Sequence, residues 1–380
     1  MIKSSIKMEA TMHKLRMFLK FILNGNLCKS KLLRVLILYT ELAGYFIACV
    51  KHLLLRQNDI KILLIHYPVN REAPFAFNLS NNLVSIQYSE DSEVKIANQI
   101  SDFSPQVILC SGWSNKFYLN VIKKYKSTSK NVVFIDNQWL GSPKQYALRL
   151  ISPFWLRRLF QATWVPGEPQ SEYAKKLGFK YNQIFTGLYV ADSNLFKPIG
   201  ESKLKQGGVF PKVMISVARY IAQKDLPTLW KAFIKANENT GNQWKLNCFG
   251  FGELYDQRIQ NPNISHHGFV QPEAMQAYLP ESGIYVLPSL FEPWGVAVHE
   301  MAMSALPMVL SDKIGSASFF LDDRNGYVFE AGNGEMLQEK LEKLMALSDE
   351  QLWKMAAHSF EQGSKLELDN WVDTLNKIIA

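Results

Sequence analysis

The chain has few cysteines, four in 380 residues. Cys28, Cys49, Cys110 and Cys248 are scattered, mostly among apolar neighbours, and no two of them have the spacing of metal ligands. Free thiols of this kind are typical of a reducing compartment. The sequence therefore favours neither a disulfide framework nor a zinc site.

Long apolar runs are also lacking. The best candidate for a membrane span, residues 35–50, contains Glu41 and lies between Arg34 and Lys51. It is shorter than the ~18 to 20 apolar residues that a span requires. Lys20 interrupts any apolar core of an N-terminal signal peptide. We therefore expect a cytoplasmic protein, and peripheral contact with the inner face of the membrane stays open.

Acidic residues are scarce at the N-terminus. Residues 1–31 hold one acidic side chain, Glu9, and seven basic ones: Lys3, Lys7, Lys14, Arg16, Lys20, Lys29 and Lys31. This segment supplies +6 of the net charge of +8, so the rest of the chain is nearly neutral. That balance argues against a nucleic-acid surface, whereas a basic arm suits anionic lipid. Residues 12–23 resemble an interfacial helix, but a solvated extension explains them equally well.

From residue 32 onward, short apolar runs alternate with longer helical segments. The length, with 47% apolar and 20% charged residues, suits two soluble globular domains. Apolar strands separated by helices predict βαβ units and parallel sheets. The expected strands are 32–39, 61–66, 84–88, 106–110, 131–136, 162–165 and 184–186 in the first half, and 212–218, 244–250, 283–287 and 307–311 in the second.

A polar stretch divides the two halves. Residues 197–208 contain Pro198 and three glycines and predict a linker. We expect an extension at 1–31, an N-terminal domain at 32–200, a C-terminal domain at 201–362 and a last helix within 363–380. Because parallel sheets bind ligands at the carboxyl ends of their strands, the cleft between the domains is the expected site.

The segment Glu292-Pro-Trp-Gly-Val-Ala-Val-His-Glu300 follows an apolar strand and opens a helix near Gly295. A helix N-terminus presents unpaired N–H groups to an anion, and a glycine there permits close approach. Glu292 precedes this end. Glu300, about a turn and a half further on, has the chemistry to accept paired hydrogen bonds from a ribose diol. Taken singly, each glutamate could equally be a cap or a surface carboxylate.

Two cations follow the first strand of the second half. Arg219 ends that strand, and Lys224 comes five residues later, just before a helix. A planar fork and a point charge together suit a diphosphate, although an exposed pair on an ordinary loop is common. The next strand ends in a turn with Gly250 and Gly252. This turn predicts a place for a nucleoside along the same sheet edge, but alone it is weak evidence.

Taken in order, these motifs resemble family 4 of the glycosyltransferases, which are retaining enzymes of the GT-B fold. The order is Ala-Arg with Lys-Asp, Gly-Phe-Gly-Glu, His267-Gly-Phe-Val270, Pro288-Ser-Leu-Phe-Glu-Pro-Trp-Gly with Glu300, and Gly326. The resemblance covers residues 210–345 well and the chain from about residue 32 loosely. It implies an α/β fold with two Rossmann-like domains facing each other across a cleft.

The resemblance implies a role for each matching residue. Arg219 and Lys224 would hold the donor diphosphate, Glu292 would contact the transferred sugar, and Glu300 would bind the ribose hydroxyls. Further donor contacts would come from a loop glycine, from the border of the base and from backbone N–H groups of the helix N-terminus: Gly44, Gly252, Val270, Gly295, Val296 and Ala297.

One position departs from the family pattern. Many members carry a histidine after the strand that corresponds to residues 132–135, whereas this chain has Asp136, which could meet a sugar or acceptor hydroxyl or cap a loop. The chain also lacks an Asp-x-Asp motif. The resemblance therefore implies that the basic pair takes the place of a metal, and we expect no cofactor and no metal.

The resemblance also implies that residues 366–379, with Trp371, form a helix that crosses back to the N-terminal domain. A terminal helix docked on the C-terminal domain is the alternative.

These expectations define a function. The sequence predicts a retaining glycosyltransferase that moves a sugar from a nucleotide-diphosphate donor to a glycan or lipid-linked acceptor, in surface polysaccharide synthesis. Two alternatives stay open: a sugar-nucleotide epimerase or hydrolase of the same fold, and a catalytically silent GT-B scaffold protein at the membrane.

Overall fold

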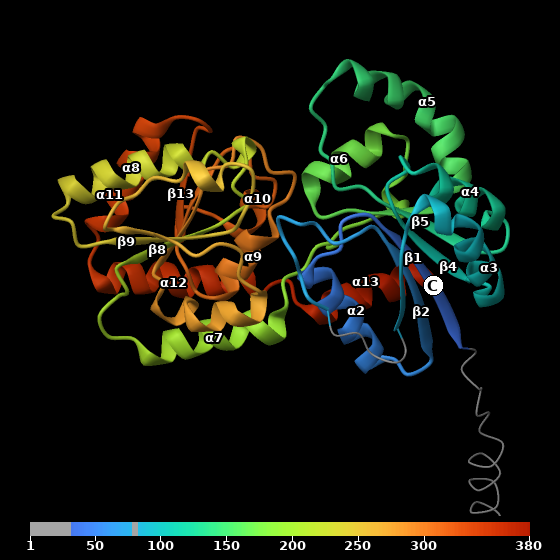
Figure 1. Ribbon diagram of the computed structural model, residues 1–380, viewed down its shortest axis with the longest axis horizontal. Coiled ribbons are helices and arrows are strands. Elements are labelled where there is room, and N and C mark those ends of the chain that lie inside the picture. The colour runs from blue at the N-terminus through green and yellow to red at the C-terminus, as the bar shows by residue number, and fades with distance from the viewer. Residues whose placement is uncertain (1–31, 78–82) are drawn as a thin grey trace, which may run out of the picture.

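The computed structural model describes residues 32–77 and 83–380. The basic segment 1–31 lies outside the described residues. The chain forms two α/β domains side by side, each built on a parallel sheet (Figure 1). In the part of the chain that the structure describes, no helix is long and apolar enough to cross a bilayer.

The N-terminal domain contains a seven-stranded sheet of order β3-β2-β1-β4-β5-β6-β7, in which every pairing is parallel. Its strands are β1 (Leu33–Tyr39), β2 (Ile60–His66), β3 (Leu83–Gln87), β4 (Val107–Ser111), β5 (Lys130–Phe134), β6 (Ala162–Trp164) and β7 (Ile184–Phe185). Its helices are α2 (Gly44–Arg56), α3 (Glu93–Phe103), α4 (Lys116–Tyr125), α5 (Pro143–Leu159) and α6 (Glu168–Lys176).

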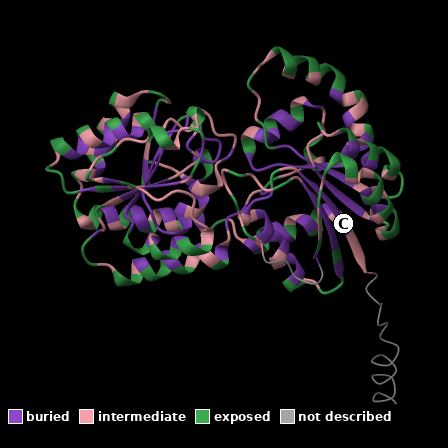
Figure 2. Cartoon of the chain, viewed as in Figure 1, coloured by how far each residue is buried: buried purple, intermediate pink, exposed green. Residues whose placement is uncertain are grey.

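Helices cover both faces of this sheet, so its strands are apolar on both sides. Along β1, Val35 and Ile37 pack into a core with α2, whereas Leu36 and Leu38 pack into a second core with α3, α4, α5 and α6. Figure 2 shows the strands as buried and the outer helix faces as exposed. The burial pattern explains why continuous apolar runs, rather than alternating ones, mark the strands in the sequence.

The C-terminal domain has a six-stranded parallel sheet of order β10-β9-β8-β11-β12-β13. Its strands are β8 (Val213–Val217), β9 (Lys245–Phe249), β10 (Ile264–His266), β11 (Ile284–Leu287), β12 (Met308–Ser311) and β13 (Gly326–Phe329). Its helices are α7 (Ser193–Gln206), α8 (Leu226–Asn239), α9 (Val296–Met303), α10 (Ala317–Phe320), α11 (Gly334–Met345) and α12 (Asp349–Gly363). The α/β class is confirmed.

The expected linker at 197–208 is wrong, because most of it belongs to helix α7. Asp192 caps this helix by accepting a hydrogen bond from the Asn194 N–H, 3.1 Å away. The helix tolerates Pro198 in its interior. Gly200 permits close packing of α7 on the C-terminal end of α9, because a Cβ at this position would lie 2.1 Å from the Met303 carbonyl oxygen. The glycine therefore allows two helices to approach closely and does not loosen the chain.

The last helix, α13 (Leu368–Ile379), lies in the N-terminal domain rather than on the C-terminal one. Trp371 is fully buried between Trp164 of β6 and Phe46 of α2, with ring centroids 4.7 and 6.1 Å away. Its indole N–H donates to the Leu188 carbonyl oxygen at 3.0 Å. The chain therefore passes between the domains twice, once before α7 and once after α12.

We predict that Gly200→Ala destabilises the protein by about 1 to 3 kcal/mol, because the added methyl group would overlap the Met303 carbonyl. Helix propensity alone predicts the opposite sign, since alanine is favoured over glycine by about 1 kcal/mol. Urea unfolding measures the difference, and Glu201→Ala, at the exposed neighbouring position, is the control. A Gly200→Ala variant as stable as the wild type would refute the contact.

Candidate active site

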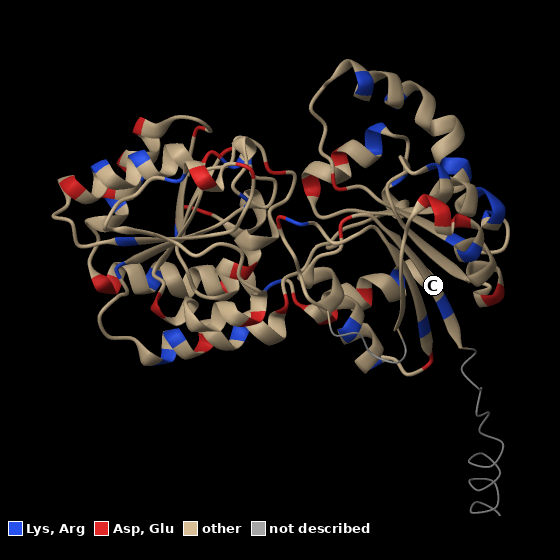
Figure 3. Cartoon of the chain, viewed as in Figure 1, with Lys and Arg blue, Asp and Glu red and all other residues tan. Residues whose placement is uncertain are grey.

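The carboxyl ends of the two sheets face one cavity of about 500 Å³ between the domains. Because parallel strands all end at the same edge, loops distant in sequence meet there. The N-terminal domain contributes the segment after β1, Ser111 at the end of β4 and Asp136 after β5. The C-terminal domain contributes Arg219 and Lys224 after β8, and residues 292–296 after β11. Figure 3 shows charged segments on both sides of this boundary.

Lys224 and Glu292 form an ion pair on the C-terminal wall of the cavity, and both side chains are largely buried. The loops that carry them are tied together. The Gln223 amide donates to the Phe291 carbonyl oxygen at 2.6 Å, and the Leu290 N–H donates to the Gln223 carbonyl oxygen at 2.8 Å. The loops after two strands therefore hold one cation and one carboxylate together.

Gly295 determines where Glu292 lies. Its φ of 90° is in the left-handed region, and it caps the N-terminus of α9. A Cβ at this position would lie 2.9 Å from Cγ of Glu292. Gly295 and Val296 both line the cavity, so the first N–H groups of α9 open onto it. The structure therefore brings the expected helix-terminus site next to the Lys224–Glu292 pair.

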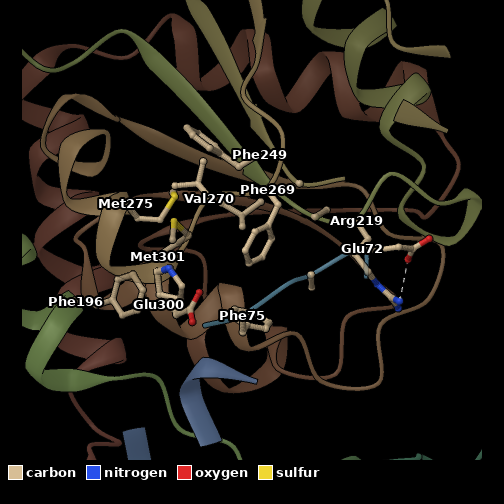
Figure 4. Close-up of a pocket in the computed structure, with 15 residues that line it drawn as sticks. Glu72, Phe75, Phe196, Arg219, Phe249, Phe269, Val270, Met275, Glu300 and Met301 are labelled. Atoms are coloured by element: carbon tan, nitrogen blue, oxygen red, sulfur yellow. Dashed lines mark hydrogen bonds and ion pairs between the residues drawn. The ribbon is translucent and has the colours of Figure 1, made fainter. Parts of the chain in front are cut away.

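A second cavity, of about 170 Å³, adjoins the first (Figure 4). Its walls are mostly apolar, and they include Phe249 at the end of β9, Gly250 after it, Val270, and Glu300 on α9. Gly250 is required there, because a Cβ would lie 1.9 Å from the Ala218 carbonyl oxygen. This cavity has the character of a nucleoside pocket: flat apolar walls with one carboxylate inside.

Arg219 lies at the junction, because it lines both cavities. Its guanidinium donates to the carboxylate of Glu72, which comes from the N-terminal domain, at 3.4 Å. Figure 4 shows this contact at one end of the smaller cavity, with Glu300 lying apart from it. A ligand that fills both cavities must pass its central part by Arg219, where a guanidinium fork can hold phosphate oxygens.

Glu300 carries the most perturbed carboxyl group of the site. It is partly buried, and among the described residues its carboxylate has neither a hydrogen bond nor an ion pair. Burial raises its pKa to about 7, and the charge of Asp192 adds to the effect. A diol that donates two hydrogen bonds would stabilise the ionised form, so this carboxylate is suited to a ribose.

Asp136 connects the large cavity to a third one, of about 350 Å³, within the N-terminal domain. The Tyr189 hydroxyl donates to its carboxylate at 3.3 Å. The side chain is open to the cavity, yet the surrounding cleft walls raise its pKa by burial. The third cavity is lined by Trp113, Tyr173 and part of α5. An acceptor bound there would meet the donor cavity at Asp136.

Three of the expected donor residues lie outside the cavity linings. Gly252 packs beneath the turn, where a Cβ would lie 2.7 Å from the Tyr220 carbonyl oxygen, and Gly250 lines the pocket instead. Gly44 is the first residue of α2, in contact distance of Pro272 and Phe75, and is not in a free loop. Ala297 faces the core of the C-terminal domain. Val270 does line the smaller cavity.

The segment of residues 70–77, for which the sequence predicts no role, reaches across the cleft from the N-terminal domain. It provides Glu72, and it provides Phe75, whose ring meets Phe269 edge to face at 5.2 Å. The Gln271 amide donates to the Pro74 carbonyl oxygen at 2.9 Å. The loop between β2 and β3 has no apolar periodicity, so only its charged and aromatic residues beside a strand end could have indicated a role.

Further contacts close the cleft on its other side. Trp294 packs so closely on Gly167 that a Cβ there would lie 2.4 Å from the indole ring. The Gln170 amide donates to the Pro293 carbonyl oxygen at 2.5 Å. The loop that carries Glu292 is therefore also a domain contact.

The sequence gives no role to His299. Its side chain is fully buried beside the two segments in which the chain passes between the domains. Its Nδ1 accepts from the Ala191 N–H at 3.0 Å, and its Nε2–H donates to the Gly363 carbonyl oxygen at 2.9 Å. Burial lowers the pKa of His299 to about 4, so the ring is neutral and can make both bonds. Ala191 precedes α7 and Gly363 ends α12. One imidazole ring therefore forms hydrogen bonds with the chain next to both crossings.

The residues that the structure describes include no group of three or more His, Cys, Asp and Glu side chains that could hold a metal ion. Arg219 and Lys224 supply the positive charge that faces the first two cavities.

Two parallel α/β domains with a cleft between their carboxyl edges define the GT-B class, and solved structures have the same fold. Sucrose-phosphate synthase from Thermosynechococcus elongatus matches with a TM-score of 0.67 and 13% identity, covering 90% of this chain and 97% of that one. HepE from Anabaena, solved with UDP and glucose, matches with a TM-score of 0.66 and 13% identity, covering 90% and 98%.

The C-terminal domain matches a known family. Residues 203–361 match the family described as glycosyl transferases group 1. A curated relative is the poly(glycerol-phosphate) alpha-glucosyltransferase of Bacillus subtilis (strain 168), 24% identical over 318 residues. The match covers 77% of this chain and 46% of the relative, so the chain spans about half the length of that protein.

Glu300 makes stability depend on pH. Its folded-state pKa of about 7 lies above the ordinary value of 4.5. The free energy of unfolding therefore decreases as pH rises between these two values. We predict that Glu300→Gln stabilises the unliganded protein at pH 8, by up to about 3 kcal/mol, and has little effect near pH 5. Urea unfolding at both pH values measures this, with the exposed Glu339→Gln as control. A gain that is equal at both pH values would refute the assignment.

Glu72 competes for Arg219 with any anionic ligand of the site. We predict that Glu72→Gln tightens UDP binding by about two- to fivefold, because the ion pair is partly exposed and worth less than about 1 kcal/mol. Isothermal titration calorimetry measures the change, and the exposed Glu90→Gln is the matched control. Unchanged or weaker binding by Glu72→Gln would contradict the competition.

Proposed function

We propose that the protein is a retaining glycosyltransferase that moves a sugar from a nucleotide-diphosphate donor to a hydroxyl group of a glycan or lipid-linked acceptor. The match of residues 203–361 to the glycosyl transferases group 1 supports sugar transfer. The donor, the acceptor and the stereochemical course are part of the proposal. The B. subtilis relative is a poly(glycerol-phosphate) alpha-glucosyltransferase, which favours a role in surface polysaccharide synthesis and a polyol-phosphate or similar chain as acceptor.

The observation that carries the proposal is the position of Arg219 between the two cavities. The smaller cavity, with Glu300 inside, has the size and lining for a nucleoside, and the larger one has room for a sugar beside Glu292. The diphosphate that joins nucleoside and sugar then passes Arg219 and Lys224. When the bond from the sugar to the diphosphate breaks, the leaving group takes the electron pair, and these fixed cations stabilise it without reorganisation.

The acceptor side is built around Asp136. Its carboxylate lies between the donor cavity and the third cavity, and Tyr189 holds it by a hydrogen bond. We assign it to binding an acceptor or sugar hydroxyl, which aligns the attacking oxygen with the sugar. Cleft closure, through contacts such as Trp294 on Gly167, excludes water from the reacting atoms.

UDP-sugars are the first donors to test, because UDP is bound in the structure of Anabaena HepE. We predict that Arg219→Ala weakens UDP binding by about ten- to a hundredfold, as expected for the loss of a charge-assisted hydrogen bond to phosphate. A thermal-shift screen of nucleotides and nucleotide sugars, followed by calorimetry, measures it. Arg324→Ala, at an exposed arginine of the same domain, is the control.

The same assay separates the alternatives. Stabilisation by one nucleotide family, with transfer to an added acceptor in the presence of EDTA, supports a metal-independent transferase. Breakdown of the donor at the same rate with and without acceptors would identify a hydrolase, and interconversion of the donor sugar an epimerase. No shift with any donor would leave a binding or scaffold protein and refute the enzyme. The anomeric configuration of the product, from its NMR coupling constants, tests retention.

A further inference from the structure

Helix α5 exposes an apolar surface on the outside of the N-terminal domain. The large exposed side chains of α5 are Tyr146, Leu150, Ile151 and Phe154, and Leu140 precedes them in the adjoining loop. Leu150 is 73% exposed and Phe154 69%, so most of each side chain is in contact with solvent. In Figure 1 this helix lies along the outer edge of the domain, and in Figure 2 it is mostly exposed. We call these five residues the α5 surface.

The spacing shows that the α5 surface is one continuous face. Tyr146, Leu150 and Phe154 follow one another at intervals of four residues, which places them in a row along a helix. The opposite side of the helix, with Ser152, Leu156 and Leu159, is buried. A surface helix of a globular protein has charged or polar residues on its outer face. In α5 the outer face is apolar as well, and nothing in the described part of the chain covers it.

The charges of α5 are all of one sign. The helix contains Lys144, Arg149, Arg157 and Arg158 and no acidic residue. At 100° per residue, Arg149 falls on one flank of the apolar row and Arg158 on the other, and Arg157 falls in line with the row. The basic residues along α5 are visible in Figure 3. An apolar face bordered by basic side chains has the composition of a helix that lies in the interface of an anionic bilayer.

From these observations we propose that α5 docks the N-terminal domain on an anionic membrane. Leu150 and Phe154 would enter the boundary between headgroups and acyl chains, and the flanking cations would contact lipid phosphates. A second copy of the chain is a poorer occupant. A twofold contact between two α5 helices would bring the same basic residues together without acidic partners.

The other side of α5 borders a cavity of the site. Lys144, Gln145 and Leu148 line the third cavity, which Asp136 connects to the donor cavity. One helix would therefore contact the bilayer on its outer face and border the acceptor cavity on its inner face. A lipid-linked acceptor would reach the cavity from the membrane surface. This last step rests on the proposed function, whereas the docking itself does not.

Vesicle flotation of the full chain tests the docking. Wild type is expected to float with vesicles of phosphatidylcholine and phosphatidylglycerol and to remain unbound with phosphatidylcholine alone. The binding constant of the Leu150→Ser/Phe154→Ser variant is expected to be lower by about tenfold or more, because the variant lacks the two apolar side chains that would leave water for the bilayer. The matched control is Leu55→Ser/Val94→Ser, at positions that are 80% and 76% exposed on other helices of the same domain.

The outcomes are distinct. Selective loss in the α5 variant, with an unchanged thermal midpoint and UDP binding, supports the proposal. If the α5 variant floats like wild type, any binding belongs to residues 1–31 or elsewhere, and the proposal is overturned. The proposal is also overturned if the wild type does not float. It is likewise overturned if light scattering shows that the wild type is a dimer and the α5 variant a monomer. UDP binding is measured in parallel, so a failure of the proposed function is seen separately.

Discussion

Two parallel sheets can present their carboxyl edges to one cleft only if the chain that joins them holds their relative position. Here it passes between the domains twice, and the His299 ring binds both crossings, at Ala191 and at Gly363. The ring can accept one hydrogen bond and donate the other because burial keeps it neutral. Since His299 lies on α9, whose N-terminus begins beside Glu292, the hinge and the site share one short helix.

The site is organised by charge as much as by shape. Arg219 and Lys224 are each paired with a carboxylate, Glu72 and Glu292. A diphosphate would replace one of these partners, and the released carboxylate would have to move or be solvated. Glu72 belongs to the opposite domain, so exchange at Arg219 would couple ligand binding to the contacts between domains.

Much of the fold and of the donor site could be predicted from the sequence, because both depend on local patterns. Buried parallel strands are continuous apolar runs. Arg219, Lys224 and Glu292 lie in the segments after such runs, and Glu300 lies in the helix that follows. The errors came from contacts between distant segments. In the sequence alone, Gly200 favours a flexible linker. Only the structure shows that Met303 packs against it and leaves no room for a side chain. Glu72 and Phe75 lie in a loop without periodicity, and their position depends on how the two domains close, which no local pattern encodes.

The central claim is that one extended nucleotide-diphosphate ligand spans both cavities past Arg219. A crystal structure of the protein with UDP tests it most directly. The account predicts phosphate oxygens about 3 Å from the Arg219 guanidinium, the ribose hydroxyls on Glu300, and Glu72 turned away from the arginine. A nucleotide bound elsewhere, or bound with the Arg219–Glu72 pair intact and Glu300 free of the ribose, would contradict it.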